Sequence, residues 1–135
     1  MTRLLAAIAL ASASASTFAA PAASAEEVEV TAGVVTGVEC ALAARAKGDL
    51  KLLASCPPAE ATKGLVVFDV AEKRIYRLAP KKVSRWQLER AFGGGSIDFT
   101  GTTVKVDRRT EIATVTVTEF SITPRPKPGA FKGCL

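Results

Sequence analysis

Five segments of the chain have patterns typical of β-strands, and their order constrains the fold more than any other feature. Residues 27–36 alternate polar and apolar side chains, as in a half-buried strand. Residues 65–70 are apolar on both faces and rich in β-branched residues, which predicts a central strand. Residues 74–78 follow after a short turn and are expected to form a hairpin with that strand. Residues 96–106 and 112–122, joined by a polar turn, complete the set.

Glycines mark the positions where the expected strands bend. Gly33 and Gly37 lie in or just after the first strand, and Gly101 separates two parts of the fourth strand that differ in phase. A glycine in a strand is typical of a bulge or a tight bend, as a barrel corner requires. We therefore expect bulges in both strands.

One short helix is predicted between the third and fourth strands. Ser84 and Gln87 have the spacing of a capping box, and Gly93 follows residues 84–92 as a stop signal. The segment between the first and second strands has no strand character. Its residues 41–47 are Ala-rich, as in a short helix, and residues 50–54 are compatible with one more turn.

Residues 1–25 have the pattern of an export signal. Arg3 gives a positive start, residues 4–10 form an apolar core, and Ala23-Ser24-Ala25 is a small-x-small cleavage site. The apolar core is too short for a good transmembrane helix. We therefore expect a mature chain that begins near Glu26, is exported to the periplasm or the exterior, and has no integral membrane segment.

The order of elements is strand, long loop, strand, strand, helix, strand, strand, which is the layout of an OB-fold barrel. The chain resembles small exported bacterial OB-fold proteins of uncharacterised function, which also tend to place cysteines after the first strand and before the second. The resemblance implies a fold and a compartment, with no reaction and no binding residues. The segments that carry it lie within residues 28–122 and are 34–37, 64–69, 75–78 and 96–102.

We thus expect an all-β fold, a small five-stranded OB-like barrel with one short helix between strands 3 and 4. It would cover residues 26–122 and be followed by a Pro-rich C-terminal tail at 123–135. An open α+β sheet built from the same strands is the alternative fold.

Three cysteines follow the predicted signal, and in an oxidising compartment a pair of them tends to form a disulfide. Three pairings are possible. We expect Cys40 to pair with Cys56, because this pair brackets a long loop that has little hydrophobic anchoring. Cys134 then remains on the tail. The fifteen residues between Cys40 and Cys56 favour a structural bond, since catalytic dithiols usually lie close in sequence.

Several kinds of chemistry are missing from the sequence. The chain has no histidine, which excludes Ser-His-Asp and Cys-His catalysis and imidazole metal ligands. The cysteines lack the C-x-x-C spacing of zinc sites. Gly93-Gly94-Gly95 is not followed by Lys and Ser or Thr, so it is not a phosphate-binding loop. We expect no metal, no cofactor and no enzymatic activity.

Two enzyme hypotheses remain as alternatives. A carboxylate-based hydrolase needs two acids that flank a cleft, and Asp98 and Glu119 lie on expected strands. Exposed strand positions explain both residues more simply. A thiol-disulfide protein would use Cys40 and Cys56 as a redox pair.

Basic residues concentrate between residues 73 and 90, around Tyr76 and Trp86. Strand alternation points Lys73, Ile75 and Arg77 outward if Tyr76 faces the core. Trp86 is expected to plug the bottom of the barrel, which leaves no aromatic platform. A solvated basic surface without a ligand is the simplest interpretation. The basic residues of this segment are Lys73, Arg74, Arg77, Lys81, Lys82, Arg85 and Arg90.

OB folds bind ligands across strands 2 and 3 and the adjoining loops. If the basic surface has a ligand, we expect it on the outward side of these strands and at the next turn, with Lys73, Arg77, Arg108 and Arg109 as binding residues. The net charge of +5, one unit of which leaves with the signal, favours anionic partners only weakly. Export argues for an anionic envelope polymer or a protein and against nucleic acid.

Overall fold

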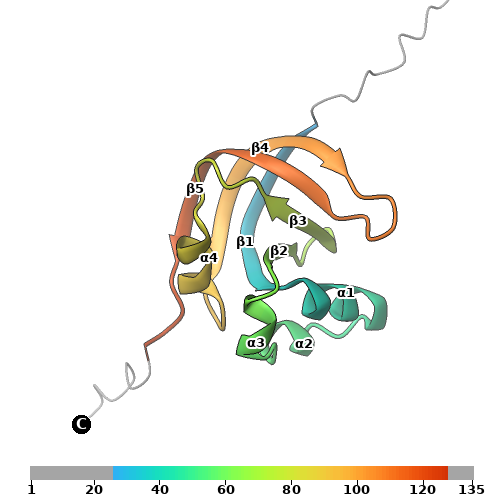
Figure 1. The fold of residues 1–135 in the computed structure, drawn as a ribbon, viewed down its shortest axis with the longest axis vertical. Helices are drawn as coiled ribbons and strands as arrows, with labels where there is room; N and C mark the ends of the chain where they lie inside the picture. The colour runs from blue at the N-terminus through green and yellow to red at the C-terminus, as the bar shows by residue number, and fades with distance from the viewer. Residues whose placement is uncertain (1–25, 128–135) are drawn as a thin grey trace, which may run out of the picture.

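The computed structural model describes residues 26–127. The predicted export signal, Cys134 and the end of the predicted tail lie outside the described residues. The described strands are β1 (Glu27–Gly37), β2 (Leu65–Asp69), β3 (Arg74–Leu78), β4 (Ser96–Val106) and β5 (Ala113–Thr123), and the helices are α1 (Val38–Lys47), α2 (Lys51–Ala54), α3 (Pro58–Ala61) and α4 (Arg85–Ala91) (Figure 1).

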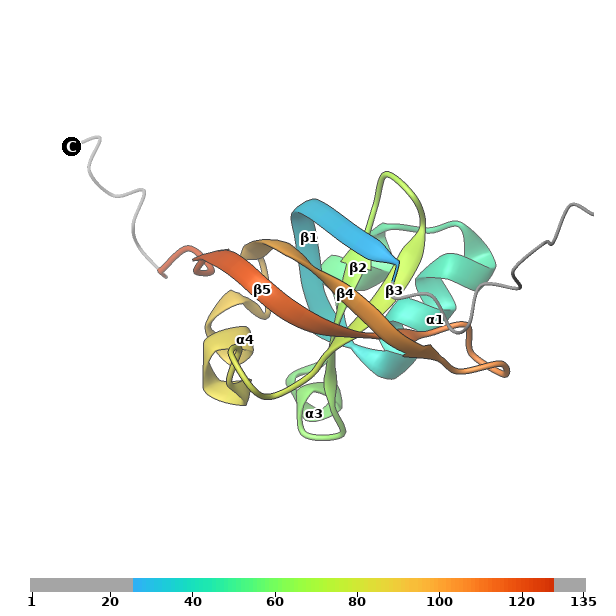
Figure 2. The same cartoon turned by 90° about the horizontal axis from the view of Figure 1, so that it is seen from above.

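The five strands close into a barrel in the order β1-β2-β3-β5-β4 (Figures 1 and 2). β2 and β3 form the predicted hairpin, with Val67 opposite Tyr76. β4 and β5 pair along nearly their whole length, from Ser96 opposite Thr123 to Val106 opposite Ala113. The pair β3–β5 is parallel and the other pairs are antiparallel, so the barrel is mixed. Its closure overturns the alternative of an open sheet.

Both predicted bulges are present. The β1–β4 register shifts between Val30 and Gly33, and the β4–β5 register shifts between Thr100 and Gly101. A Cβ atom at Gly33 would lie 2.4 Å from Cγ1 of Val67, which is closer than side chains can approach. β1 can therefore bend across the barrel at Gly33 only because this residue has no side chain.

A carboxylate on the neighbouring strand stabilises the β1 bulge. Ala32 has a φ of 55°, an uncommon conformation for a residue with a side chain. Its backbone N–H donates to Oδ1 of Asp98 at 2.6 Å. Asp98 thus satisfies a donor that the irregular strand pairing would otherwise leave without a partner.

The barrel has one hydrophobic core inside and a second one outside. Val67 and Tyr76 belong to the cluster that fills the interior. On the outer face of β2 and β3, Val66, Phe68 and Ile75 pack with α1 and are almost fully buried. This double burial explains why residues 65–70 are apolar on both faces.

The region between β1 and β2 departs from the expected fold class. It contains three helices, so the domain is a mostly β barrel with helices rather than all-β. Of these, α1 and α2 coincide with the helical turns predicted at residues 41–47 and 50–54, whereas α3 was not predicted. α1 and α2 supply hydrophobic cover for the outer face of β2. Among residues 26–127, no helix combines the length and hydrophobicity needed to cross a membrane.

Helix α4 begins as predicted but orients its aromatic residue differently. The Ser84 backbone N–H donates to Oε1 of Gln87 at 2.8 Å, as in the expected capping box. Trp86 does not plug the barrel, because 59 % of its surface is exposed. Leu88 and Phe92, on another face of the helix, enter the interior cluster instead.

We predict that Gly33→Ala lowers the free energy of unfolding by about 1–3 kcal/mol, the usual cost of overpacking. The added methyl group would collide with Val67 and force β1 to shift. Urea denaturation followed by circular dichroism measures the effect. The exposed neighbour Thr31→Ala is the control and should change stability by less than about 0.5 kcal/mol. Equal stability of the Gly33→Ala protein and the parent would contradict the tight packing of the bulge.

Candidate functional site

Charged side chains from several elements surround a cavity at one end of the barrel. This cavity, the barrel-end pocket, has a volume of about 410 Å³. Arg45 comes from α1, Lys73 from the β2–β3 turn and Arg74 from the start of β3. Two acids, Glu26 and Glu111, line the same pocket. The site therefore has mixed charge, with three cations facing two carboxylates.

The turn between β4 and β5, residues 107–112, forms one side of this end of the barrel. The backbone N–H groups of Arg109 and Thr110 donate to Oδ1 of Asp107 at 2.8 and 3.3 Å. These bonds, with smaller contributions from the charges of Arg109 and Arg77, lower the pKa of the Asp107 carboxyl. The guanidinium of Arg45 donates to the Thr110 carbonyl and so connects α1 to the turn.

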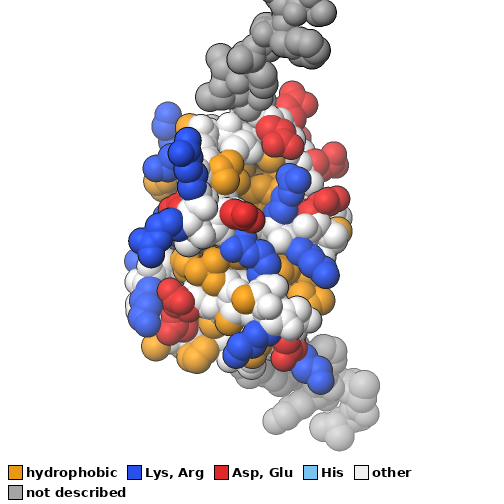
Figure 3. Space-filling view, turned by 90° about the vertical axis from the view of Figure 1, so that its right-hand side faces the viewer, with side chains coloured by type: hydrophobic (Ala, Val, Ile, Leu, Met, Phe, Trp, Pro, Cys, Tyr) orange, Lys and Arg blue, Asp and Glu red, His pale blue; other side chains and the backbone are white. Residues whose placement is uncertain are grey.

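The four predicted binding residues gather around this turn. Lys73 lines the barrel-end pocket, and Arg77 lies near enough to Asp107 to influence its carboxyl group. Arg108 and Arg109 are exposed in the turn itself. Figure 3 views the molecule from the side of the turn and shows lysine and arginine side chains over much of this face, with acidic ones concentrated near its upper right margin.

Most of the outward side of β2 and β3, where the sequence predicts a ligand surface, is buried. Ile75 faces outward from β3, as strand alternation predicts, but it is 0 % exposed because the helical layer with α1 covers it. The outer face of β2, and of β3 at Ile75, is therefore an internal packing surface, whereas Arg77 further along β3 is exposed. The accessible charged side chains lie at the margin of the helical layer, where Arg45 is located. No motif in the sequence marks Arg45, which reaches the pocket because α1 packs beside the turn.

The predicted basic segment is divided between two regions. Lys73, Arg74 and Arg77 lie near the β4–β5 turn, whereas the basic residues from Lys81 to Arg90 lie in α4 or just before it. Figures 1 and 2 both show α4 and the β4–β5 turn on opposite sides of the barrel. The basic residues of this one segment therefore lie on two separate surfaces of the domain.

The two carboxylates of the hydrolase hypothesis do share a groove. Asp98 and Glu119 line an open groove of about 340 Å³ on the outer side of β1, β4 and β5, together with Glu29. Oδ1 of Asp98 is occupied by the Ala32 N–H, so this carboxylate has a structural role in the bulge. Within residues 26–127, no three acidic or cysteine side chains are grouped as a metal ion would require.

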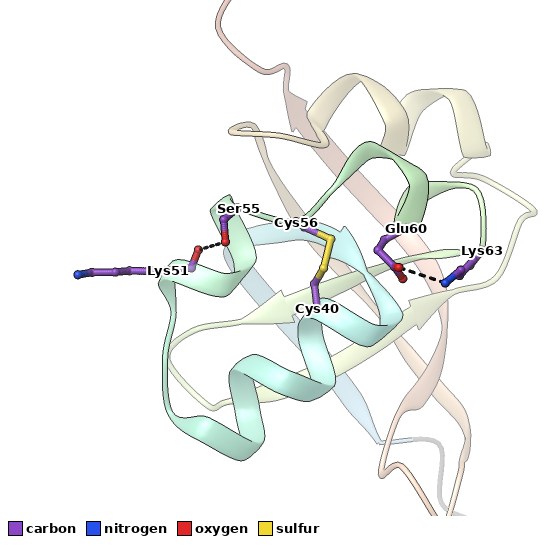
Figure 4. Close-up of a disulfide and its surroundings, with 6 residues drawn as sticks. All are labelled: Cys40, Lys51, Ser55, Cys56, Glu60 and Lys63. Atoms are coloured by element: carbon purple, nitrogen blue, oxygen red, sulfur yellow. Dashed lines mark hydrogen bonds and ion pairs between the residues drawn. A yellow bond between two sulfur atoms is a disulfide. The ribbon is translucent and has the colours of Figure 1, made fainter.

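The predicted disulfide between Cys40 and Cys56 is present (Figure 4). It joins Cys40 in α1 to Cys56 in the segment between α2 and α3, across a Cα–Cα distance of 5.8 Å. Cys56 is buried and Cys40 is half-buried. The bond thus restrains the helical layer that covers β2 and β3.

Tyr76 lies between the interior core and the barrel-end pocket. Its ring packs edge-on against Phe99, with 5.9 Å between the ring centroids. Burial raises the pKa of the Tyr76 hydroxyl above its usual value of 10.0, and the neighbouring Arg74 guanidinium opposes this shift. An ion pair of 3.8 Å between Arg74 and Glu26 positions that guanidinium at the entrance of the pocket.

Comparisons of the chain with models of protein families, with curated proteins and with solved structures find no match. The barrel-end pocket can bind anionic groups through its arginines and Lys73, because guanidinium and ammonium groups form charge-assisted hydrogen bonds with such groups.

We predict that replacing Cys40 and Cys56 with Ala lowers the free energy of unfolding by about 3 kcal/mol, the value expected for a loop of this size. Urea denaturation, performed in a Cys134→Ala background, measures the loss. A reductant should destabilise the background protein by the same amount and leave the double variant unchanged. A disulfide without effect on stability would contradict its role in restraining the helical layer.

We also predict that Tyr76, the sole tyrosine of the chain, titrates above pH 10.0 in the folded protein and near that value in urea. The unfolded chain loses the Tyr76 proton at a lower pH than the folded protein does. The contribution of Tyr76 to the free energy of unfolding is therefore fully present below pH 10.0 and is lost as the pH rises through the folded pKa. Ultraviolet absorption of the tyrosinate follows the titration.

Arg74→Gln should raise the folded pKa of Tyr76 further, since it removes the charge that favours the tyrosinate. The exposed Lys105→Gln is the control and should leave the midpoint unchanged. A folded midpoint at or below the midpoint in urea would show that Tyr76 is not desolvated.

Proposed function

We propose that this chain is an exported, non-enzymatic binding domain that contacts an anionic polymer or protein of the cell envelope or exterior. Its contact surface consists of the predicted residues Lys73, Arg77, Arg108 and Arg109, joined by Arg45 and Arg74. The observation that carries the proposal is the convergence of cations from α1, the β2–β3 hairpin and the β4–β5 turn around one end of the barrel.

We assign the barrel to the OB type on its strand order and on the position of α4 between β3 and β4. OB folds bind ligands on strands 2 and 3 and on the β1–β2 and β4–β5 connections. Here the helical layer occupies the strand face. The β4–β5 turn, with Arg108 and Arg109, and the margin of α1 are then the parts of the usual ligand region that a partner can reach.

Two observations support export. Residues 1–25 have the pattern of a cleaved signal, and the domain contains a disulfide, a bond that persists mainly in oxidising compartments. In such a compartment acidic glycans, anionic lipid headgroups and acidic proteins are the available anions, whereas nucleic acid is scarce. The proposed mature domain covers residues 26–122, with a tail at 123–135.

The shared groove of Asp98 and Glu119 supports one alternative, a carboxylate-based hydrolase. We place it second because the Ala32 N–H occupies one oxygen of Asp98 and the groove is open to solvent. A thiol-disulfide function would use the Cys40–Cys56 bond. The burial of Cys56 favours a structural role for that bond.

We predict that charge reversal of Lys73, Arg77, Arg108 and Arg109 to Glu lowers the salt concentration at which the protein elutes from immobilised cell-envelope extract. Removing a cation that pairs with an anionic polymer weakens binding and reduces its dependence on salt. The Arg108→Glu/Arg109→Glu double variant should show a smaller change in the same direction.

The control for a change of charge elsewhere on the domain is Lys51→Glu/Lys63→Glu, at exposed positions in and near α2 and α3; Lys63 pairs only with Glu60, at 3.1 Å, among the described residues. It should elute close to the parent protein. If all variants elute like the parent, or if the control changes as much as the Arg108 and Arg109 variant, the assignment of the surface is wrong.

A further inference from the structure

A groove runs between α3 and α4, away from the barrel-end pocket. This α3–α4 groove has a volume of about 520 Å³. Pro58 and Thr62 form one wall, Trp86 and Phe92 belong to the other, and Arg90 and Arg125 line it as well. It combines an aromatic ring with two guanidinium groups, which is the composition of binding hot spots in proteins.

The Trp86 side chain is exposed and does not belong to the hydrophobic core. With 59 % of its surface accessible, it is the most exposed of the large hydrophobic side chains described. The guanidinium of Arg90, one helical turn further along α4, lies over the indole at 5.7 Å from the ring centroid. This cation–π contact holds the ring in place before any ligand arrives. The indole is therefore a preorganised flat surface.

The walls of the groove are fixed by Arg85. Its guanidinium donates to the carbonyl groups of Ala61 and Thr62 at 3.2 and 3.3 Å, and this connects α3 to α4. It also pairs with Glu89 at 3.0 Å, so the one carboxylate that lines the groove already has a cationic partner. The groove retains a positive charge from Arg90 and Arg125, because neither arginine forms an ion pair with another of the described residues.

Arg125 is positioned by the backbone. Its N–H donates to the Arg90 carbonyl at 2.9 Å, which places the segment after β5 beside the end of α4. The two cations that line the groove therefore come from elements that are attached to one another. A ligand with acidic groups spaced along a chain can meet both of them.

We propose that the α3–α4 groove binds an acidic saccharide, with a sugar ring stacked on Trp86 and its acidic groups paired with Arg90 and Arg125. Sugar rings present flat C–H faces that pack on indole, and the planar guanidinium fork matches carboxylate geometry. The site lies apart from the surface of the proposed function and does not depend on it.

Two other occupants fit the groove less well. A peptide would need main-chain partners, but the carbonyl groups of Ala61 and Thr62 already accept from Arg85. The chain's own residues 128–135 carry Lys132 as their charged side chain, which does not complement two arginines.

Trp86 is the sole tryptophan of the chain, so its fluorescence reports directly on the groove. We would titrate the purified chain with galacturonate oligosaccharides and compare maltohexaose, polyphosphate, oligothymidylate and vesicles of phosphatidylglycerol. Saturable quenching or a blue shift with oligogalacturonate is expected. Binding of neutral maltohexaose or ring-free polyphosphate should be weaker by about tenfold or more, since each lacks one of the two contacts.

Arg90→Gln/Arg125→Gln should weaken oligogalacturonate binding by at least about tenfold, and Lys51→Gln/Lys63→Gln is its matched control. Trp86→Phe, measured by calorimetry, should weaken binding by a similar factor because the larger stacking surface is removed. Circular dichroism and urea denaturation verify that each variant is folded. Arg108→Glu/Arg109→Glu should leave this titration unchanged, which separates the result from that for the barrel-end surface.

Several results would overturn the proposal. A response to oligothymidylate or to vesicles without one to oligogalacturonate would assign the groove to nucleic acid or to a lipid surface. A chain that ends at residue 127 and binds oligogalacturonate at least about tenfold more tightly would show that the tail occupies the groove in the full chain. Equal affinities of the Arg90→Gln/Arg125→Gln variant and its control for oligogalacturonate would show that the two arginines do not contribute to binding.

Discussion

Burial of β2 on both of its faces is the constraint on which the rest of this domain depends. Val67 faces the barrel interior, whereas Val66 and Phe68 face outward, and all three are almost fully buried. A five-stranded barrel by itself covers only the inward face. The chain between β1 and β2 supplies the missing layer, since α1 and Leu53 of α2 pack on the outer side. Each apolar side chain buried in this way contributes about 1.5–3 kcal/mol.

The helical layer determines which parts of the strand surface are exposed. It covers most of the outer face of β2 and β3 and brings Arg45 beside the β4–β5 turn. The disulfide at Cys40 and Cys56 restrains the same layer, so stability and the position of this surface are connected through one element.

The opposite side of the barrel has a different organisation. There α4 uses Leu88 and Phe92 for the core, which leaves Trp86 on the surface. Arg85 is not part of a loose basic patch, because it connects two helices and pairs with Glu89. Arg90 and Arg125 remain available to a ligand. Two surfaces with different chemistry, one of mixed charge and one aromatic and basic, therefore occupy separate parts of a small domain.

Local patterns in the sequence determined the strands, the bulges at Gly33 and Gly101, the capping box at Ser84 and the cysteine pair. Each depends on neighbours within a few residues or on side-chain periodicity, or, for the cysteines, on the loop that they enclose. Tertiary packing decided what these patterns cannot encode. Trp86 lies outside because Leu88 and Phe92 already fill the end of the barrel, and Asp98 serves the bulge because β4 brings it to Ala32. Arg45 reaches the pocket because the apolar outer face of β2 holds α1 beside the turn, a contact between residues that are far apart in the chain.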